Sequence, residues 1–490
     1  MAFSGSCARS RPVTLPPVPV EAVDPVRHLT ADFDSLLDQP GHRRGTWGIV
    51  VQSLARNDRL YERNPRTLLL PASTMKLVSV ATAAEAVGWE HAFETTMLAT
   101  GPVVKGVLQG DLVIAGSGDP SVLGRGGDDS FAPWIDALRA HGITRIDGRV
   151  VADDDAHEEP TPGFAWSWED LGYTYGAMPG ALNLAENRLD IVVSPAPLEG
   201  LPAIVELPAE ARDLPVANRA RTAAAGTPEN LWPELRPGEP MLTLNGTIGV
   251  GEKPATVSIA AGNPTEWFAR AVRNRVLAAG IDVAGAAIDA DDLPARPDWS
   301  HAATLHVHRS RPLSEIVKPL VKDSINLYAE AVLRLATGPG GPRTTDAALD
   351  AARARLESWG IPKDGIQIVD GSGLSRRNVV APETLLAILQ RFYDASGTSP
   401  FMQAQAVAGR DGTLASRMKD TPAEGNAIGK TGSLSNVRTL AGYVKTADGE
   451  PLAFAIMANN FEGAASDVTA TIDRLAARLA SFSRAPLTVQ

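Results

Sequence analysis

The stretch Pro71-Ala72-Ser73-Thr74-Met75-Lys76-Leu77-Val78 decides how this sequence folds and where its chemistry lies. An alanine-rich apolar run continues to Val87 and stops at Gly88, which is typical of a helix that ends in a glycine C-cap. Ser73 is therefore expected at a helix N-terminus, where free backbone N–H groups and the helix dipole stabilise negative charge. Lys76 follows on the same helical face and can serve as the base for the Ser73 hydroxyl, provided that burial and nearby cations lower its pKa.

Near the C-terminus, Lys430-Thr431-Gly432 precedes two apolar runs that are joined by the hairpin turn Asp448-Gly449. It is the third of three motifs along the chain. This pattern predicts that the three residues lie on an edge strand beside Ser73, where Lys430 is one of the cations expected to lower the pKa of Lys76. Gly432 lets a ligand approach the backbone closely, and the side chains of Lys430 and Thr431 can bind a substrate carboxylate. The backbone N–H groups of Ser73 and Ser433 are expected to form an oxyanion hole.

The second motif along the chain, Ser324-Ile325-Asn326, opens an apparent amphipathic helix. Ser324 can relay a proton to a leaving amine, and the Asn326 amide can bond both Lys76 and a substrate carbonyl. The alternative is that Ser324 is simply the N-cap of the helix, which is the usual role of a serine in this position. The motif alone favours the cap, whereas the three motifs together favour catalysis.

One further stretch repeats the serine–lysine spacing. Ser416-Arg417-Met418-Lys419 runs directly into Asp420-Thr421-Pro422, with no apolar helical run after the serine. We interpret this second copy as chance.

The order S-x-x-K, S-x-N and K-T-G resembles the signature of active-site serine enzymes that recognise penicillin. Further segments resemble the D-alanyl-D-alanine carboxypeptidase/endopeptidase family, the class C low-molecular-mass penicillin-binding proteins, and the likeness covers most of residues 45–480. These segments are residues 110–120, 168–177, 181–187, 322–330, 370–376 and 408–414. Two positions differ from the more usual residues, Asp323 in the second motif and Ser433 after the third.

The resemblance implies an α/β (α+β) fold in which a serine β-lactamase/DD-peptidase-like catalytic domain, an antiparallel sheet flanked by helices, carries a large and mainly β inserted region. The spacing of the motifs agrees with an insertion between the first and the second motif. Ser73 and Ser324 are 251 residues apart, whereas Ser324 and Lys430 are 106 residues apart. We expect strands near residues 103–114, 145–152, 241–250 and 255–260, and one helix that opens at Asn263-Pro264. The expected domains are a Pro-rich N-terminal linker at 1–30, catalytic parts at 31–95 and 306–490, and an insertion at 96–305 with a smaller subdomain near 185–245.

Composition excludes several classes of function. The 490 residues carry a formal net charge of −11, which argues against nucleic acid or an anionic membrane surface as a partner. No run approaches the length of a membrane span. The one cysteine excludes an internal disulfide and a zinc–cysteine site, and His306 and His308, on one face of an apparent strand, are expected to pack or to face solvent rather than to bind a metal. We therefore expect neither a metal nor a cofactor, and the oligomeric state stays open.

No export signal is visible in Met1-Ala2-Phe3-Ser4-Gly5-Ser6-Cys7, which lacks an apolar core, so we expect either that the true start lies upstream or that a signal segment has been removed. Cys7 is either the remnant of a lipid-attachment site or, more simply, an incidental cysteine. An extracytoplasmic location, the periplasm or the cell envelope, is implied by the resemblance alone.

The resemblance implies a serine D-Ala-D-Ala carboxypeptidase and endopeptidase that acts on peptidoglycan stem peptides through an acyl-enzyme and is acylated by β-lactam antibiotics. The alternatives are a β-lactamase-like or esterase hydrolase, and a cell-wall binding protein without catalysis. The family's inserted domain supplies an acidic residue for the amino group of the substrate's diamino acid. Asp153, in an acidic triplet at a strand end, is the candidate for this role, with Leu434 lining the same pocket, although such a triplet can also be a solvated turn.

Overall fold

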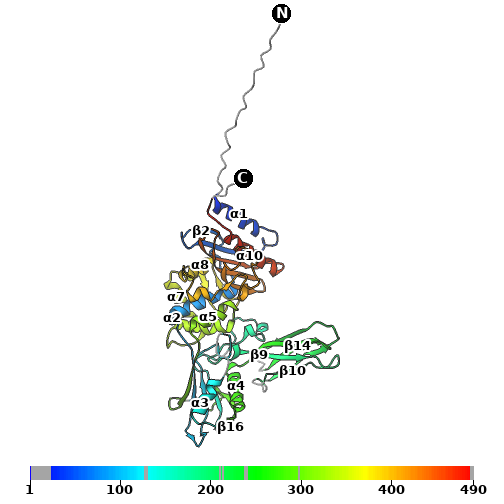
Figure 1. Cartoon of the computed structure of the whole chain (residues 1–490), viewed down its shortest axis with the longest axis vertical. Helices are drawn as coiled ribbons and strands as arrows, with labels where there is room; N and C mark the ends of the chain where they lie inside the picture. The colour runs from blue at the N-terminus through cyan, green and yellow to red at the C-terminus, as the bar shows by residue number, and fades with distance from the viewer. Residues whose placement is uncertain are drawn as a thin grey trace.

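The computed structural model describes residues 1, 24–125, 131–159, 161–208, 211, 215–236, 241–295 and 298–485. The molecule is elongated, with the sheet formed by the two ends of the chain at one extreme and the middle of the chain at the other (Figure 1). A β-rich arm that contains β9, β10 and β14 projects sideways from the long axis (Figure 1). The mixed α/β fold expected from the sequence is confirmed.

A six-stranded antiparallel sheet combines both ends of the chain in the order β2-β1-β24-β23-β22-β21. Its strands are β1 (Thr46–Ser53), β2 (Arg59–Arg63), β21 (Ala406–Val407), β22 (Ile428–Leu434), β23 (Val437–Lys445) and β24 (Pro451–Asn459). The short β21 pairs only with Ile428 and Gly429, so β22 presents a free edge from Lys430 onward. This geometry agrees with the edge strand expected for Lys430-Thr431-Gly432.

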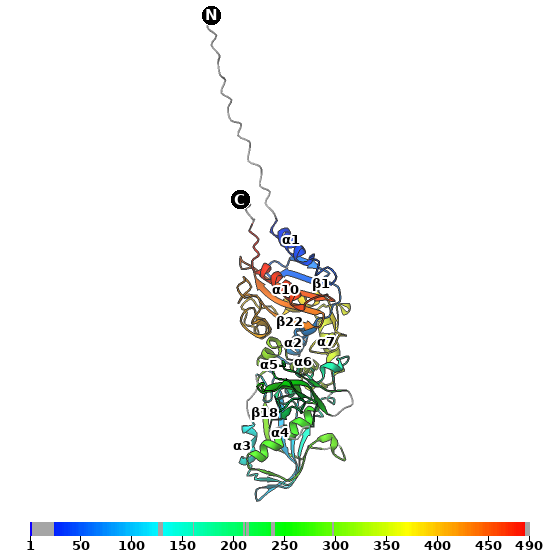
Figure 2. The same cartoon turned by 90° about the vertical axis from the view of Figure 1, so that its right-hand side faces the viewer.

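Helices cover both faces of this sheet (Figure 2). One face packs against α1 (Pro25–Leu37) and α10 (Ala465–Ala480), and the other against α2 (Met75–Val87), α5 (Leu313–Lys322), α6 (Asn326–Arg334), α7 (Thr345–Ser358), α8 (Pro382–Arg391) and α9 (Pro400–Gln403). Successive residues of β24 alternate between the two cores, since Phe454 and Ile456 join the first and Ala455 and Met457 the second. The buried sheet therefore fixes α2, and with it Ser73, against β22.

The first helix corrects the expected N-terminal linker at 1–30, because α1 already begins at Pro25. The Asp24 side chain accepts a hydrogen bond from the Val26 N–H (3.0 Å), which caps the helix, and Leu29, Phe33 and Leu37 are fully buried. The (i, i+4, i+8) spacing of these three apolar residues is the signal for a helix that the proline content of the segment obscured. Residues 2–23, including Cys7, lie outside the described residues.

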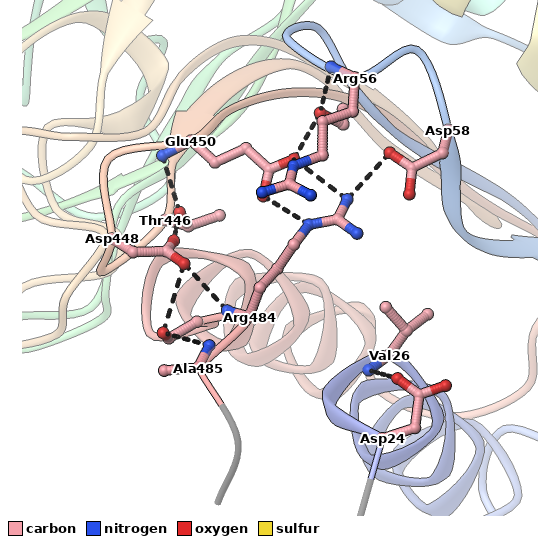
Figure 3. Close-up of polar contacts among 11 residues, drawn as sticks. Asp24, Val26, Arg56, Asp58, Thr446, Asp448, Glu450, Arg484 and Ala485 are labelled. Carbon is pink, nitrogen blue, oxygen red and sulfur yellow. Dashed lines mark hydrogen bonds and ion pairs between the residues drawn. The ribbon is translucent and has the colours of Figure 1, made fainter.

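The last described residues lie near the start of α1, at the same end of the sheet (Figure 3). The Arg484 guanidinium bonds Glu450 (2.8 and 3.0 Å) and Asp58 (2.9 Å), and the Arg484 N–H donates to Asp448 (2.9 Å). These contacts hold the chain after α10 against the turns of the sheet, on the side away from the middle of the chain.

The described chain between α2 and α5 builds two sheets besides those of the arm, and consecutive strands of the same segments run from one of these two sheets into the other. The five-stranded sheet runs β17-β8-β6-β3-β18, from β3 (Glu94–Ala99), β6 (Leu112–Ala115), β8 (Val150–Asp153), β17 (Ala287–Asp289) and β18 (Ala303–Arg309). The second runs β16-β7-β5-β4, from β4 (Val103–Val104), β5 (Val107–Leu108), β7 (Arg145–Ile146) and β16 (Asp282–Val283). Helices α3 (Ala132–Ala140) and α4 (Pro264–Ala278) pack on them. Because β3 pairs antiparallel with β18, this segment leaves and rejoins the rest of the protein at neighbouring points.

The arm consists of short strands. A three-stranded sheet contains β10 (Ile204–Glu206), β9 (Arg188–Ser194) and β15 (Ala255–Ala260), and a four-stranded sheet contains β11 (Val216–Asn218), β12 (Arg221–Ala223), β13 (Asn230–Glu234) and β14 (Leu242–Gly249). A small ribbon of β19 (Ile366–Gln367) and β20 (Val379–Val380) lies with the C-terminal part of the chain. Strands and the α4 helix are found where the sequence predicts them, while the division into domains stays a prediction.

No helix among the described residues is both long enough and apolar enough to cross a bilayer.

Candidate active site

Ser73 lies in the single-turn 3₁₀ helix η1 (Ala72–Thr74) that leads directly into α2. Helix α2 ends at Val87 with Gly88 as its C-cap, as the sequence predicts. Ala72, just before the serine, has a φ of 47°, a left-handed conformation that costs a non-glycine residue energy and is found most often at functional sites. A Cβ on Gly373 would lie 1.8 Å from the Ala72 carbonyl oxygen, so only glycine permits this close approach of the two segments.

Lys76 is the central group of the site. Its Nζ lies 2.8 Å from the Ser73 Oγ, 2.6 Å from the Asn326 Oδ1 and 2.9 Å from the Ser372 carbonyl oxygen. The side chain is completely buried, and this burial lowers the pKa of Lys76 from 10.5 to about 7, although the nearby carboxylates of Asp370 and Glu330 oppose the change. Of the two causes expected from the sequence, burial and neighbouring cations, burial is therefore the one that lowers the pKa of Lys76. Lys76 is within reach to take the Ser73 proton.

A buried loop at residues 370–375 supports Lys76 from behind. The Asp370 carboxylate accepts the backbone N–H groups of Gly373 (2.7 Å) and Ser375 (2.6 Å), and Glu330 on α6 accepts that of Ser372 (2.8 Å). Burial, together with the charge of Asp370, raises the pKa of Glu330 to about 7. These carboxylates hold the Ser372 carbonyl against Lys76. The sequence indicates this loop only by resemblance and predicts no role for it.

Strand β22 forms the opposite wall of the site. A Cβ on Gly432 would lie 3.0 Å from the Ser73 backbone nitrogen and 2.2 Å from the Thr439 Oγ1, so the strand passes directly beside the nucleophile. Lys430 is fully buried, its Nζ donates to the Thr431 carbonyl oxygen (2.8 Å), and burial together with the charge of Lys76 lowers the pKa of Lys430 well below its usual value. The Thr431 hydroxyl donates to Thr413 (2.8 Å).

The second motif meets the first through Asn326. Its Oδ1 accepts from Lys76, and its Nδ2 donates to the Tyr175 carbonyl oxygen (2.8 Å). Ser324 lies just before α6 with a φ of 64°, and the N-cap of that helix is Ile325, which makes no side-chain capping bond. Ser324 is therefore not the helix cap that the alternative interpretation required.

These residues meet in one cleft of about 380 Å³. Of the residues singled out from the sequence, Ser73, Ser324, Asn326, Thr431, Ser433 and Leu434 line this cleft. Lys76 and Lys430 lie buried behind its wall, and Gly432 brings β22 against Ser73. The remaining lining residues are Asp170, Tyr175, Gly373, Leu374, Arg376, Thr413 and Ser435.

Asp170 is the cleft-lining carboxylate that the sequence analysis missed. It lies at the end of the 3₁₀ helix η2 (Trp168–Asp170), and its Oδ1 accepts the Tyr175 hydroxyl (3.1 Å). Asp153, the predicted candidate, is absent from the cleft lining: it ends β8, is 8% exposed, and accepts hydrogen bonds from the Trp299 indole and the Asp155 N–H. Asp153 therefore supports the local fold. The available signal was the tyrosine-rich segment after residue 168, which the sequence analysis had placed by resemblance.

Two other sequence features lie apart from the cleft. Ser416 is exposed in a turn after the 3₁₀ helix η9 (Gly412–Leu414) and is not part of the cleft lining. His306 and His308 pack their rings 5.9 and 5.8 Å from that of Trp134.

One cluster of acidic residues brings its oxygens close enough together for a cation. Asp154, Glu159 and Asp291 each place a carboxylate oxygen within 4.8 Å of the others. A hydrogen bond with Asp291, burial and the neighbouring negative charges raise the pKa of Glu159 to about 8. A proton shared within the cluster relieves its repulsion at neutral pH, so these contacts do not by themselves indicate a metal.

The fold and the site together define an active-site serine enzyme of the acyl-transfer class. The profile of the D-Ala-D-Ala carboxypeptidase 3 (S13) family matches residues 29–479. The chain is 33% identical over 468 residues to the D-alanyl-D-alanine carboxypeptidase of Actinomadura sp. (strain R39), covering 93% of this chain and 85% of that protein. It is 28% identical over 425 residues to the D-alanyl-D-alanine carboxypeptidase DacB of Haemophilus influenzae, covering 84% and 85%.

Solved structures agree. The crystal structure of penicillin binding protein 4 (dacB) from Haemophilus influenzae superposes with a TM-score of 0.79 at 26% identity, covering 92% of this chain and 99% of that one. The same protein complexed with a β-lactam gives a TM-score of 0.73 at 25% identity, with the same coverage. The chain belongs to the D-Ala-D-Ala carboxypeptidase 3 (S13) family, and it is a peptidase.

Proposed function

We propose that this protein is a serine D-Ala-D-Ala carboxypeptidase that cleaves peptidoglycan stem peptides through a covalent acyl-enzyme on Ser73. The observation that carries the proposal is the 2.8 Å contact between the Ser73 Oγ and a buried Lys76 whose pKa is lowered to about 7. A lysine with that pKa is mostly uncharged at a pH slightly above 7. Only the uncharged lysine can accept a proton.

Acylation begins when the Ser73 Oγ attacks the carbonyl carbon between the two D-alanines while Lys76 takes the hydroxyl proton. The carbonyl π bond opens, and its electron pair moves to the oxygen. Backbone N–H groups of Ser73 and Ser433 stabilise this oxyanion, which is consistent with the close approach of β22 to the Ser73 nitrogen.

Collapse of the tetrahedral intermediate breaks the C–N bond and releases D-alanine. The leaving nitrogen takes a proton that originates on Lys76 and passes through the Ser324 hydroxyl, which lines the same cleft as the nucleophile. Asn326 keeps Lys76 in place through its Oδ1. Water then attacks the ester carbonyl, a proton returns to the Ser73 Oγ, and the shortened peptide leaves.

The terminal carboxylate and the diamino acid of the substrate are expected to contact different groups in the cleft. The hydroxyls of Thr431 and Thr413 bond one another in the cleft lining, and we assign them to the terminal carboxylate, which the buried charge of Lys430 also favours when that lysine is protonated. Asp170 offers a negative charge for an amino group on the substrate's diamino acid, with Leu434 lining the same cleft. We assign to Asp170 the role that the sequence analysis had given to Asp153.

The same acyl transfer extends to two related reactions. A crosslink between stem peptides also has a D-alanyl carbonyl, so endopeptidase activity follows if its leaving amine belongs to a second peptide. A β-lactam presents a strained amide next to a carboxylate and acylates Ser73 in the same way. Because crosslinked peptidoglycan lies outside the cytoplasm, we propose an extracytoplasmic location, the periplasm or the cell envelope.

A β-lactamase needs a carboxylate that activates water against the acyl-enzyme. Among the described residues that line the cleft, Asp170 is the only carboxylate, and it bonds the Tyr175 hydroxyl. Glu330 is engaged by backbone N–H groups behind Lys76. This arrangement favours slow hydrolysis of a penicilloyl enzyme and hence the peptidase. The complete set of serine, lysine and asparagine contacts likewise favours an enzyme over a binding protein.

The test combines substrate turnover with active-site labelling. Purified protein should release D-alanine from a stem pentapeptide and retain a fluorescent penicillin through denaturing electrophoresis. Ser73→Ala should lose both signals, and Ser416→Ala, which changes the serine of the second S-x-x-K, should keep both. Retained label on Ser73→Ala would contradict the nucleophile assignment, and an active-site label without any D-alanine release would contradict the carboxypeptidase.

A further inference from the structure

A second and larger cavity, of about 560 Å³, lies behind one wall of the catalytic cleft. Its volume falls within the roughly 300–1,000 Å³ of small-molecule sites. Trp166, Trp168 and Leu171 form one wall, and Leu189 and Ile259 from the base of the arm face them. The lining is mostly apolar, as it is in sites that bind a ligand through its non-polar faces.

The cavity and the catalytic cleft share η2 as a common wall. Trp168, at the start of η2, lines the cavity, and Asp170, at its end, lines the cleft. The Trp166 indole donates to Asp370 (2.9 Å), whose loop holds the Ser372 carbonyl on Lys76. The cavity and the cleft are thus adjacent along the three residues of η2.

The charged groups around the cavity are already paired. Arg236 bonds Glu234 (2.7 Å), and Glu266 bonds Arg270 (2.5 and 3.0 Å). Among the described residues of the lining, no charged group is left unpaired for a carboxylate or an amine, and burying a charge without a partner is costly. It favours an uncharged ligand that has an apolar face and a few groups for hydrogen bonding.

The exposed aromatic side chain of Trp168 adds to this preference. Trp168 is 47% exposed although it is a large apolar residue, and exposed aromatic surface beside a functional site is typical of ligand contact. The C–H face of a pyranose ring stacks on an aromatic ring, while the ring's hydroxyl and acetamido groups reach polar atoms. A neutral amino sugar fits each of these properties, whereas the charged groups of a stem peptide do not.

We propose that this cavity binds an N-acetylated sugar of the glycan strand to which the stem peptide is attached. The inference rests on the proposed function, because it needs the stem peptide to occupy the cleft. About four residues separate the sugar's lactyl group from the scissile bond, and in extended form they span on the order of 15 Å. The substrate can then occupy the cleft and the cavity together, bent around η2.

The experiment compares two substrates that share one stem pentapeptide, one free and one attached to an N-acetylglucosaminyl–N-acetylmuramyl disaccharide. The ratio of their kcat/KM values isolates the contribution of the sugar. We expect the wild type to favour the disaccharide substrate, and Trp168→Ala to reduce the ratio about two- to tenfold, the size of one aromatic stacking contact. Trp168→Phe should restore part of it.

The matched control is Trp232→Ala, which removes a comparably exposed tryptophan (39%) from β13, outside the cavity lining. Its ratio should equal that of the wild type. A second measurement, saturation-transfer NMR on Ser73→Ala with the peptide-free disaccharide, should show binding that Trp168→Ala in the same background weakens.

Three results would overturn the inference: a wild-type ratio near one, equal losses on both substrates in Trp168→Ala, or binding of an acyl-chain probe but not of the disaccharide. The last would assign the cavity to lipid. Failure of the wild type to cleave either substrate would instead contradict the proposed function, so the two failures are distinguishable.

Discussion

The rate of acylation should follow the titration of Lys76. Burial lowers the pKa of Lys76 from 10.5 to about 7. The protonated lysine, which dominates below this pH, cannot accept the Ser73 proton, and the neutral lysine, which dominates above it, can. Acylation is therefore expected to rise with pH through about 7 and then to level off.

The magnitude follows from the fraction of neutral lysine. With a pKa of about 7, that fraction is about 0.01 at pH 5 and about 0.9 at pH 8, so the acylation rate constant should rise about ninetyfold over this interval. A lysine with its ordinary pKa would instead give a rise of about a thousandfold, with no levelling below pH 10.

The assay is stopped-flow acylation by a fluorescent penicillin between pH 5 and pH 9, with tryptophan fluorescence recorded to confirm that the protein stays folded. Glu330→Gln provides a matched perturbation, because the Glu330 carboxylate raises the pKa of Lys76 and the neutral amide does not. Its midpoint should move to lower pH. A rate that still increases tenfold per unit above pH 8, or a flat profile, would refute the assignment of Lys76 as a base with a pKa of about 7.

Three further predictions address the walls of the site and the fold. Gly432→Ala places a Cβ 2.2 Å from a threonine hydroxyl on the neighbouring strand, so penicillin labelling should fall at least tenfold, whereas Gly41→Ala, with open space around its Cβ, should label normally. Asp170→Asn should lower kcat/KM severalfold to a hundredfold for peptides with a free side-chain amine while sparing penicillin acylation, and equal losses on both would contradict a role in specificity. Phe33→Ala should lower the free energy of unfolding by about 3–5 kcal/mol in urea titrations, because the ring is fully buried under α1, and a change below about 1 kcal/mol would show that α1 adds little to stability.

Local sequence patterns were sufficient for the elements that carry the three motifs. Each of these elements depends on the backbone preference of a few neighbouring residues. The signals are the glycine C-cap at Gly88, the turn at Asp448-Gly449 and the helix start at Asn263-Pro264. The structure has α2, the β23–β24 hairpin and α4 at these places. Spacing between motifs also indicated a long segment between α2 and the second motif.

Local sequence patterns do not predict contacts between segments that are distant in the sequence. Asp170 and residues of β22 line the same cleft, and apart from the tyrosines that follow it, nothing near Asp170 in the sequence indicates a substrate contact. Asp153 had the acidic context that the sequence analysis looked for, yet its carboxylate is used by the Trp299 indole and a backbone N–H. Glu330 resembles an ordinary helical glutamate until its contacts with the 370–375 loop are known.

Two opposing effects make Lys76 suitable as a base. Burial alone would favour the neutral amine so strongly that Lys76 would hold the Ser73 proton weakly during attack. The carboxylates of Asp370 and Glu330 act in the other direction, and the result is a pKa close to neutral, where a general base combines availability with proton affinity. Asp370 and Glu330 are thus positioning residues that touch no substrate. Because they act through Lys76, replacing either should change the pH dependence of acylation before it changes the affinity for the peptide.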